Sequence, residues 1–509
     1  EYRNPEEWRG KGTDWQDVMT RTALNQSFNL NVTHGTEDFN GFFSIGYKDS
    51  QGAVKYSDFK RLTLRANMDY EPNDFIKTGL KLNPTIRWWG NQVGGSRGSS
   101  WGRAIMVPPT DGPYKDDVPN ENEAYFDGKW DLDIYSDGTF HFTNSLYQLR
   151  ETVNNDKNYD LNIQPYIQIS PVEGLNLRSQ FNMEAGQSFN EYFRPSTVAT
   201  AWTPPPQERA GSYGTGESVG WQFENTVNYE NSFGNHNLSG LAGYTMEYYN
   251  GYSSSMSATG FPSDAIKTLN AATEFDGGTW ESEWSMISYI FRLNYDYNAK
   301  YLFTGTLRRD GSSRFGADRR WGYFPSASVG WNITKESFFP DPSWLTNLKL
   351  RASYGFSGNN AIGNYTWIPN LYENNYTTGG TVTSGKSVGC LENRQLSWER
   401  SNEFDAGLDL TLFDGRLNVI FDYYNKITED MLWNVNIPIS SGFSSTTKNI
   451  GKIRNRGVEL AVNSVNISNN EFTWETDFNI AFNRNKVLDL GNVEKIQNGI
   501  GFSDRKSVV

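Results

Sequence analysis

Residues 61–70 read RLTLRANMDY, so that every second residue of the stretch is apolar. Successive side chains of a β-strand point to opposite faces, and such a strand would be apolar on one face and polar or charged on the other. The same alternation returns at residues 80–88, 408–412 and 472–480. The strands of a soluble β-sandwich also alternate in this way. The lengths of the connections between strands distinguish it from a barrel that spans a membrane.

The connections of the predicted strands alternate in length. Period-two counting predicts about sixteen strands, each near the ~10 residues that cross a bilayer at a tilt. Brief turns rich in Asn, Asp and Gly are expected at 36–39, 71–74, 171–174, 231–235, 297–300 and 414–415. Long Gly/Ser/Asn/Pro-rich stretches are expected at 90–156, 187–219, 250–283, 357–397 and 428–455. This order predicts an all-β fold, a transmembrane antiparallel β-barrel with short periplasmic turns and long extracellular loops.

The composition narrows the class of protein further. Of 509 residues, 37% are hydrophobic and 21% charged. The sequence contains no run of eighteen apolar residues, so it predicts no transmembrane helix. The 15% aromatic content, with 17 Trp and 28 Tyr, fits the aromatic girdles of a membrane barrel. The net charge of −13 argues against nucleic acid as a partner, because phosphate binding requires a basic surface. The single cysteine, Cys390, excludes an internal disulfide framework and a multi-cysteine metal site.

The strand count also predicts on which side of the membrane the two ends of the chain lie. By this count the chain begins and ends on the long-loop side, whereas bacterial outer-membrane barrels normally carry both ends in the periplasm. A spanning sheet must close on itself, because lipid offers no partner to an open edge. We therefore expect a fragment that lacks an odd number of strands at each end. The expected division is an extracellular loop segment at 1–26, a partial transmembrane barrel at 27–484 and the start of another extracellular loop at 485–509.

Several short blocks occur in a fixed order along the chain. The most specific one spans residues 309–326, which begin RDGSSRFG and end RWGYFPS. The others are DWQD at 14–17, NLNVTHG at 29–35, GYKDSQG at 46–52, LKLRASYG at 348–355, LSWE at 396–399 and NRGVEL at 455–460. Together these blocks resemble the SusC/RagA family of TonB-dependent outer-membrane transporters over nearly the whole chain.

This resemblance implies a complete barrel of about 22 strands, with one strand before Glu1 and five after Val509. It implies a location in the outer membrane of a Gram-negative bacterium and import of a bulky nutrient, an oligosaccharide or a peptide, rather than an enzymatic reaction. The implied partners are membrane lipid, a SusD-like surface lipoprotein that covers the long loops, and TonB. In the family, TonB is contacted through an N-terminal region that precedes the first strand and is missing from this sequence, as is the plug domain.

Two other functions remain open at this point. The chain could belong to a different TonB-dependent receptor, for an iron chelate or a vitamin, although the block 309–326 counts against it. It could also be a soluble β-rich glycan-binding protein, which would stay dispersed without detergent.

Aromatic residues on or beside the long loops are the candidates for contact with substrate or partner. A flat ring with a polar edge suits stacking on a sugar as well as packing against a neighbouring protein. These residues are Trp88, Trp89, Trp101, Trp202, Trp280, Trp367 and Tyr372. The alternative is that Trp88 and Trp89 belong to the aromatic girdle and that the others pack the loops against each other.

The sequence predicts no catalytic site and no cofactor. The three histidines, His34, His141 and His236, have no ligand-like spacing. The longest loop contains four aspartates that are candidates for calcium, without the spacing of an EF-hand, and a solvated acidic loop is the alternative. They are Asp127, Asp131, Asp133 and Asp137. Arginines at 314, 319 and 320, next to Asp310, are expected to join their loop to the barrel wall, and binding of a ligand is the alternative.

Overall fold

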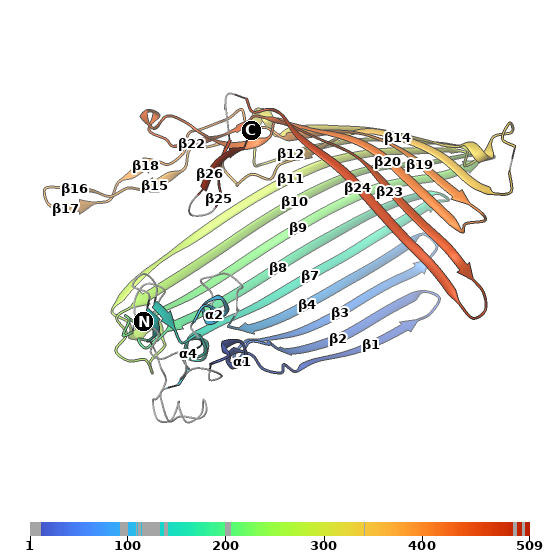
Figure 1. The fold of residues 1–509 in the computed structure, drawn as a ribbon. Helices are drawn as coiled ribbons and strands as arrows, with labels where there is room; N and C mark the ends of the chain where they lie inside the picture. Colours follow the sequence, from blue (N-terminus) through green and yellow to red (C-terminus); the bar gives the residue numbers. More distant parts are fainter. Residues whose placement is uncertain are drawn as a thin grey trace.

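A computed structural model of the chain describes residues 12–91, 100–107, 109, 113–114, 133–136, 141–198, 205–340, 342–491, 496–500 and 504–508. Sixteen antiparallel strands form one sheet in which each strand pairs with the one before it and the one after it (Figure 1). They are β1 (Asn25–Gly35), β2 (Phe39–Gln51), β3 (Asp58–Asn73), β4 (Ile76–Gly90), β7 (Val153–Val172), β8 (Leu175–Arg194), β9 (Ala210–Phe233), β10 (His236–Thr259), β11 (Glu274–Tyr297), β12 (Tyr301–Ser312), β13 (Trp321–Asn332), β14 (Leu345–Asn359), β19 (Glu399–Leu412), β20 (Leu417–Glu429), β23 (Lys452–Ser468) and β24 (Thr473–Asp489).

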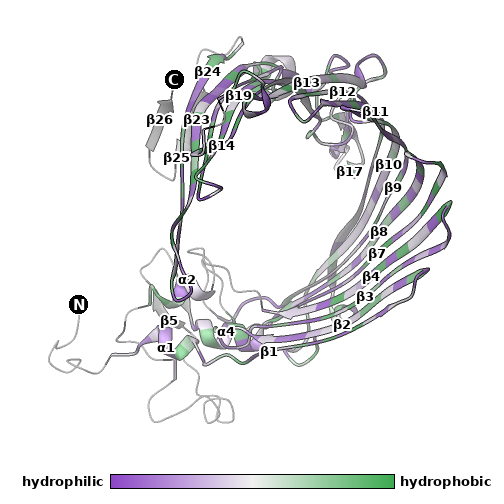
Figure 2. Ribbon diagram, turned by 90° about the vertical axis from the view of Figure 1, so that its right-hand side faces the viewer, coloured by the Kyte–Doolittle hydropathy of each residue, from purple (hydrophilic) through white to green (hydrophobic). Residues whose placement is uncertain are grey.

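The sheet curves into an arc, with β1 and β24 at its two edges (Figure 2). Among the described residues these two strands do not pair with each other, so the sheet is open. The expected sixteen strands and the antiparallel barrel architecture are confirmed.

Short and long connections lie at opposite ends of the sheet, as expected. The short connections are 36–38, 74–75, 173–174, 234–235, 298–300, 413–416 and 469–472, with a longer turn at 333–344. The connections at the other end are 52–57, 91–152, 195–209, 260–273, 313–320, 360–398 and 430–451. We call these the short-turn end and the long-loop end.

The strands in the middle of the sheet are longer than the sequence predicted. β9, β10 and β11 each contain 24 residues, and the stretches 187–219 and 250–283, expected as loops, are largely strand. The register of β10 and β11 runs without a break from His236↔Tyr297 to Thr259↔Glu274. Gly and Ser suggest loops when they are considered alone, but the strand segments within these stretches pair with at least one neighbouring strand.

Pro84 interrupts the sheet on one side only. The β3–β4 register passes from Thr63↔Thr85 to Ala66↔Leu82 without a pair at Pro84, whereas the β4–β7 register includes Pro84↔Leu161. Because proline has no N–H group, the missing ladder bond falls on the β3 side.

The two faces of the sheet differ in polarity. Across β1 to β4 one face presents a continuous apolar surface that includes Leu30, Val32, Phe43, Ile45, Leu64 and Leu82. We call this the apolar face, and the opposite one, which carries Arg87 and Asp160, the polar face. The alternation of polar and apolar residues along the strands is visible in Figure 2.

Small hairpins and short helices lie outside the sixteen-stranded sheet, most of them in the long connections. The hairpins are β5 (Asp133–Ser136) with β6 (His141–Thr143), β15 (Leu371–Glu373) with β18 (Lys386–Val388), β16 (Tyr376–Thr378) with β17 (Thr381–Thr383), β21 (Leu432–Asn436) with β22 (Ser445–Asn449), and β25 (Ile496–Ile500) with β26 (Asp504–Val508). The helices are α1 (Trp15–Met19), α2 (Ser100–Ala104) and α4 (Ser145–Glu151), with 3₁₀ turns η1 (Leu269–Ala271), η2 (Ala317–Arg319), η3 (Ile333–Lys335) and η4 (Ile439–Ser441). Helix α1 precedes β1, the hairpin β25–β26 follows β24, and η3 lies in the turn 333–344. In the described part of the chain, no helix is long and apolar enough to cross a membrane.

The apolar clusters of buried residues lie at the long-loop end. One joins α1, α2 and α4 and includes Trp15, Met19 and Leu146. A second contains Phe315, Phe324, Leu396 and Trp398, and a third contains Phe193, Ala258 and Phe261. These clusters hold the loops in place above the wall of the sheet.

Candidate functional site: the polar face and the long loops

Ion pairs between neighbouring strands cover the polar face. Arg87 of β4 donates from Nε and Nη2 to Oδ2 of Asp160 on β7, at 3.1 and 2.7 Å. Arg351 of β14 pairs with Asp409 of β19 at 3.1 Å and with Asp405 at 3.4 Å, and it also contacts Asp422 of β20. Hydrocarbon cannot solvate such groups, so this face must be turned towards water.

A hollow of about 450 Å³ opens near the long-loop end of β7 to β11, mainly on the polar face. Its lining combines small residues with polar and aromatic ones: Asn158, Asp160, Gly186, Ser188, Gly216, Ser218, Tyr249, Gly251, Ser253, Trp280 and Ser282 are among them. Glycine and serine on adjacent strands leave the backbone accessible, so a ligand could approach the wall closely.

The rings of Trp280 and Tyr249 in this hollow each lie close to the backbone of a glycine. A Cβ on Gly278 would stand 3.5 Å from the ring of Trp280, and one on Gly220 would stand 3.4 Å from the ring of Tyr249. Since Trp280 is 60% exposed, one side of its ring is open to the interior of the arc. A flat, exposed indole with hydroxyl and carboxylate groups nearby suits stacking on a sugar or on an apolar side chain of a peptide.

Arg314 joins this aromatic group to the neighbouring loops. Its guanidinium lies 5.0 Å from the ring centroid of Trp284, which stacks with Tyr249 at a centroid distance of 6.4 Å. Arg314 Nε donates to Asn364 Oδ1 at 2.9 Å, and Nη1 donates to the carbonyl oxygen of Asn360 at 3.2 Å. Burial lowers the pKa of Arg314, but a guanidinium remains charged at neutral pH.

The two other arginines of this loop make similar contacts. Arg319 donates to the side chain of Gln395, and Arg320 donates to the carbonyl oxygen of Phe315. The hydrogen bonds of the three arginines hold loop 313–320 against loop 360–398 and against itself. The expected contact with the barrel wall is seen for Arg314, at the ring of Trp284 on β11.

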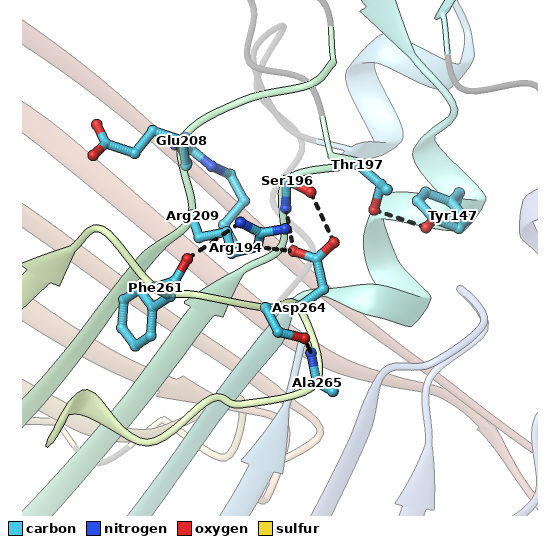
Figure 3. Close-up of polar contacts among 10 residues, drawn as sticks. Tyr147, Arg194, Ser196, Thr197, Glu208, Arg209, Phe261, Asp264 and Ala265 are labelled. Atoms are coloured by element: carbon cyan, nitrogen blue, oxygen red, sulfur yellow. Dashed lines mark hydrogen bonds and ion pairs between the residues drawn. The ribbon is translucent and has the colours of Figure 1, made fainter. Parts of the chain in front are cut away.

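Asp264 joins two other long loops (Figure 3). Ser196 donates to its carboxylate from both the backbone N–H and the hydroxyl, each at 2.7 Å, and Arg209 donates from Nε at 2.7 Å. Burial alone would raise the pKa of Asp264, but the hydrogen bonds from Ser196 and Arg209 lower it below its ordinary value. The ionised carboxylate therefore fixes loop 260–273 to loop 195–209.

The same contact region extends to helix α4. Tyr147 donates its hydroxyl hydrogen to Thr197 Oγ1 at 2.8 Å (Figure 3), and burial raises the pKa of Tyr147. Three long loops are thus linked by side-chain contacts, and together they present a defined surface at this end of the sheet.

The aromatic candidates from the sequence occupy different environments. Trp88 and Trp89 end β4 on opposite faces, with Lys157 Nζ 5.8 Å from the Trp88 ring and Phe59 6.3 Å from the Trp89 ring. Trp101 packs against the cluster around α1, Trp367 packs against the cluster around Phe315, and Tyr372 is exposed on β15. Trp202 lies outside the described residues. Of the candidates that the structure describes, Trp280 lines the hollow, as does Tyr249.

Tyr249 and the glycines of the hollow were not among the residues singled out from the sequence. The available signal was the spacing of Gly214, Gly216 and Gly220 within a strand-like stretch, because glycine inside a strand often marks a close approach to its backbone.

The aspartates considered for calcium are only partly described. Asp127, Asp131 and Asp137 lie outside the described residues, and Asp133 begins β5, of which only the backbone is described. In the part of the chain that the structure describes, no group of three or more His, Cys, Asp or Glu side chains is placed to hold a metal ion.

An antiparallel meander with an apolar face, an ion-paired polar face and long connections at one end only is the wall of a transmembrane β-barrel. The chain belongs to the TonB dependent receptor-like β-barrel family, whose model matches residues 99–503. This places the protein in the outer membrane, with the apolar face towards lipid and the polar face towards the lumen, and excludes the soluble glycan-binding alternative.

Individual relatives agree with this assignment. TonB-dependent receptor P39 of Formosa agariphila is 32% identical over 496 residues, which are 96% of this chain and 45% of the relative. TonB-dependent receptor SusC of Bacteroides thetaiotaomicron is 30% identical over 511 residues, covering 94% of this chain and 48% of SusC. The structure of the RagAB peptide transporter matches with a TM-score of 0.83 and 26% identity, over 96% of this chain and 54% of that one.

The resemblance to SusC and RagA that the sequence blocks indicated is thereby confirmed. The chain spans about half the length of the relatives that it matches. Proteins of this family are transporters and receptors, not enzymes.

Proposed function

We propose that this chain forms most of the barrel wall of a TonB-dependent importer for a bulky nutrient, an oligosaccharide or a peptide. The observation that carries the proposal is the hollow at the long-loop end, which Trp280 and Tyr249 line together with Asn158 and Asp160. Similarity to SusC and to the RagAB peptide transporter supports the same class of function. Iron chelates and vitamins are the alternative substrates.

The chemistry of the wall suits passage of such a substrate. The aromatic rings would contact the apolar parts of the nutrient, while the hydroxyl, amide and carboxylate groups of the hollow would bind its polar groups. The ion pairs Arg87–Asp160 and Arg351–Asp409 keep the polar face charged and hydrated. Energy would come from TonB, acting through a region N-terminal to the barrel in the whole protein.

We further propose that a SusD-like surface lipoprotein binds the long loops. The hairpins β15–β18 and β16–β17 project from the sheet as an arm at residues 371–388 (Figure 1). Their apolar residues face solvent, with Leu371 63% and Val382 70% exposed, and Tyr372 and Tyr376 also exposed. An exposed group of aromatic and aliphatic side chains on an ordered arm favours a protein interface.

The test uses the full-length protein in its native membrane, extracted in mild detergent. Replacing Leu371, Tyr372 and Val382 together with serine should release the lipoprotein and stop growth on the nutrient, while the barrel remains heat-modifiable. Phe338→Ser is the matched control, because Phe338 is equally exposed but lies in a turn at the short-turn end. Co-purification that survives the triple substitution, or a full-length protein that never carries a lipoprotein, would contradict the proposed partnership.

A further inference from the structure

Four cationic side chains meet on the last two strands of the sheet. Arg454 of β23 pairs in register with Lys486 of β24, and Arg456 pairs with Arg484. Directly opposite residues of an antiparallel pair have Cβ atoms about 4.5–5.5 Å apart and share a face, and residues two apart on one strand also share a face. We call these four residues the basic group.

The basic group lies on the apolar face, at its long-loop border. The next same-face pairs towards the short-turn end are Val458↔Phe482, Leu460↔Ile480 and Val462↔Phe478, all of them apolar. β23 starts at Lys452, directly after the long connection 430–451. The four cations therefore follow the lipid-facing belt of these strands on its extracellular side.

No acidic side chain neutralises the basic group within the described part of the chain. None of its four residues takes part in an ion pair or a side-chain hydrogen bond there, whereas the adjacent Lys452 pairs with Glu429 at 3.4 Å. On β20 the residues opposite Arg454 and Arg456 are Ile427 and Asn425, which are uncharged.

This concentration of positive charge calls for a counter-charge outside the described residues. Like charges that face each other across a strand pair are destabilising, and the chain as a whole is acidic, with a net charge of −13. At the extracellular border of a lipid-facing belt, the phosphate groups of the lipid head region are within reach. Guanidinium groups bind phosphate with two parallel hydrogen bonds, which suits three arginines in one group.

We propose that Arg454, Arg456, Arg484 and Lys486 bind the phosphate groups of an anionic lipid in the outer leaflet of the outer membrane. The acyl chains of this lipid would cover Val458 and Phe482 directly below. The site holds the barrel at a defined depth and belongs to the membrane-facing surface. It is therefore independent of which nutrient the transporter carries.

The experiment measures binding of purified diphosphoryl lipid A to the full-length protein in a non-ionic detergent, by native mass spectrometry. Replacement of all four residues by glutamine should weaken the binding by roughly tenfold or more, and added salt should weaken binding to the wild type. Dephosphorylated lipid A should bind the wild type as poorly as the phosphorylated lipid binds the variant.

The matched control is the double variant Lys60→Gln/Lys157→Gln. Both lysines stand opposite Trp88 on the apolar face at the same end of the sheet, so this variant removes interfacial charge without touching the basic group. Its lipid A binding should stay within about twofold of the wild type. If the variant with all four residues replaced does not give a heat-modifiable barrel, the double variant Arg456→Gln/Arg484→Gln is used instead. It should also bind lipid A more weakly than the wild type.

Three results would overturn the proposal. These are unchanged binding in the glutamine variants, equal binding of dephosphorylated lipid A, and full competition by inorganic phosphate at the same concentration as the lipid. The last result would indicate a site for free phosphate. Loss of lipid A binding with normal growth on the nutrient would support the lipid site while leaving the proposed transport function untouched.

Discussion

The guanidinium of Arg209 donates a hydrogen bond from Nε to the carboxylate of Asp264 at 2.7 Å, across 55 residues of sequence. The same arginine donates from Nη1 to the carbonyl oxygen of Phe261 at 3.2 Å. One side chain thus fixes the loop after β8 to the loop after β10, and both loops border the strands that form the hollow around Trp280.

Asp264→Asn should loosen these two loops. The amide keeps the shape of the side chain but removes its charge and one acceptor oxygen, and charge-assisted hydrogen bonds contribute about 1.5–3 kcal/mol each when shielded, less at this partly exposed site. We expect limited proteolysis to cut residues 195–209 and 260–273 faster in the variant. Glu208→Gln, an exposed acid in the same loop, should leave the cleavage rate unchanged, and equal protection in both variants would contradict the role of Asp264.

Glu336 should make the stability of the barrel depend on pH. Its carboxylate accepts hydrogen bonds from the Tyr301 hydroxyl at 2.6 Å, Lys300 Nζ at 2.9 Å and Trp331 Nε1 at 2.9 Å, and these contacts lower the pKa of Glu336 to about 2. A lowered pKa stabilises the fold above the unfolded value, near 4.5, and the stabilisation is lost as the pH falls from there towards 2.

The measurement for Glu336 is the heat-modification midpoint of wild type and Glu336→Gln between pH 7 and pH 2.5. The variant should unfold at a lower temperature at pH 7, and the difference should shrink as the pH falls below 4.5. Glu173→Gln, in another short turn, is the control. If the difference in midpoint between wild type and Glu336→Gln grows on acidification, the predicted direction of the pH dependence is wrong.

Leu64→Arg should destabilise the barrel strongly. Leu64 lies within the continuous apolar surface of β1 to β4, and an arginine at a lipid-facing midplane position costs roughly 2–4 kcal/mol. Asn67→Arg places the same charge on the polar face of the same strand and should cost much less. Urea unfolding of both variants in lipid vesicles tests this, and equal destabilisation of the two would mean that the two faces are assigned incorrectly.

Trp280→Ala should weaken nutrient binding with little effect on folding. Aromatic contacts contribute about 0.5–1.5 kcal/mol beyond their buried area, so we expect Kd to rise by roughly twofold to tenfold, with partial retention in Trp280→Phe. Phe275→Ala removes an exposed ring from the opposite face of the same strand and should bind like the wild type. Calorimetry with the nutrient on which the organism grows gives the values; unchanged Kd in Trp280→Ala would exclude this residue from the site.

Much of the candidate site could not be predicted from single positions. Trp280 was singled out because of its residue type and its place near a long stretch, and it does line the hollow. Trp101 and Trp367, chosen on the same grounds, pack against buried clusters instead. Residue type alone does not distinguish these cases, because packing against the loop clusters depends on residues far away in the sequence.

The sequence by itself determined the number of strands, their two faces and the alternation of short and long connections. These are local properties: side chains alternate with a period of two, and turns such as the one at Gly234, with a φ of +61°, require residues that tolerate a positive φ. The lengths of β9 to β11, the hollow and the basic group depended on the tertiary structure. Register alone brings Gly186 beside Ser218 and Arg456 opposite Arg484, and register is set by backbone pairing along the whole length of neighbouring strands.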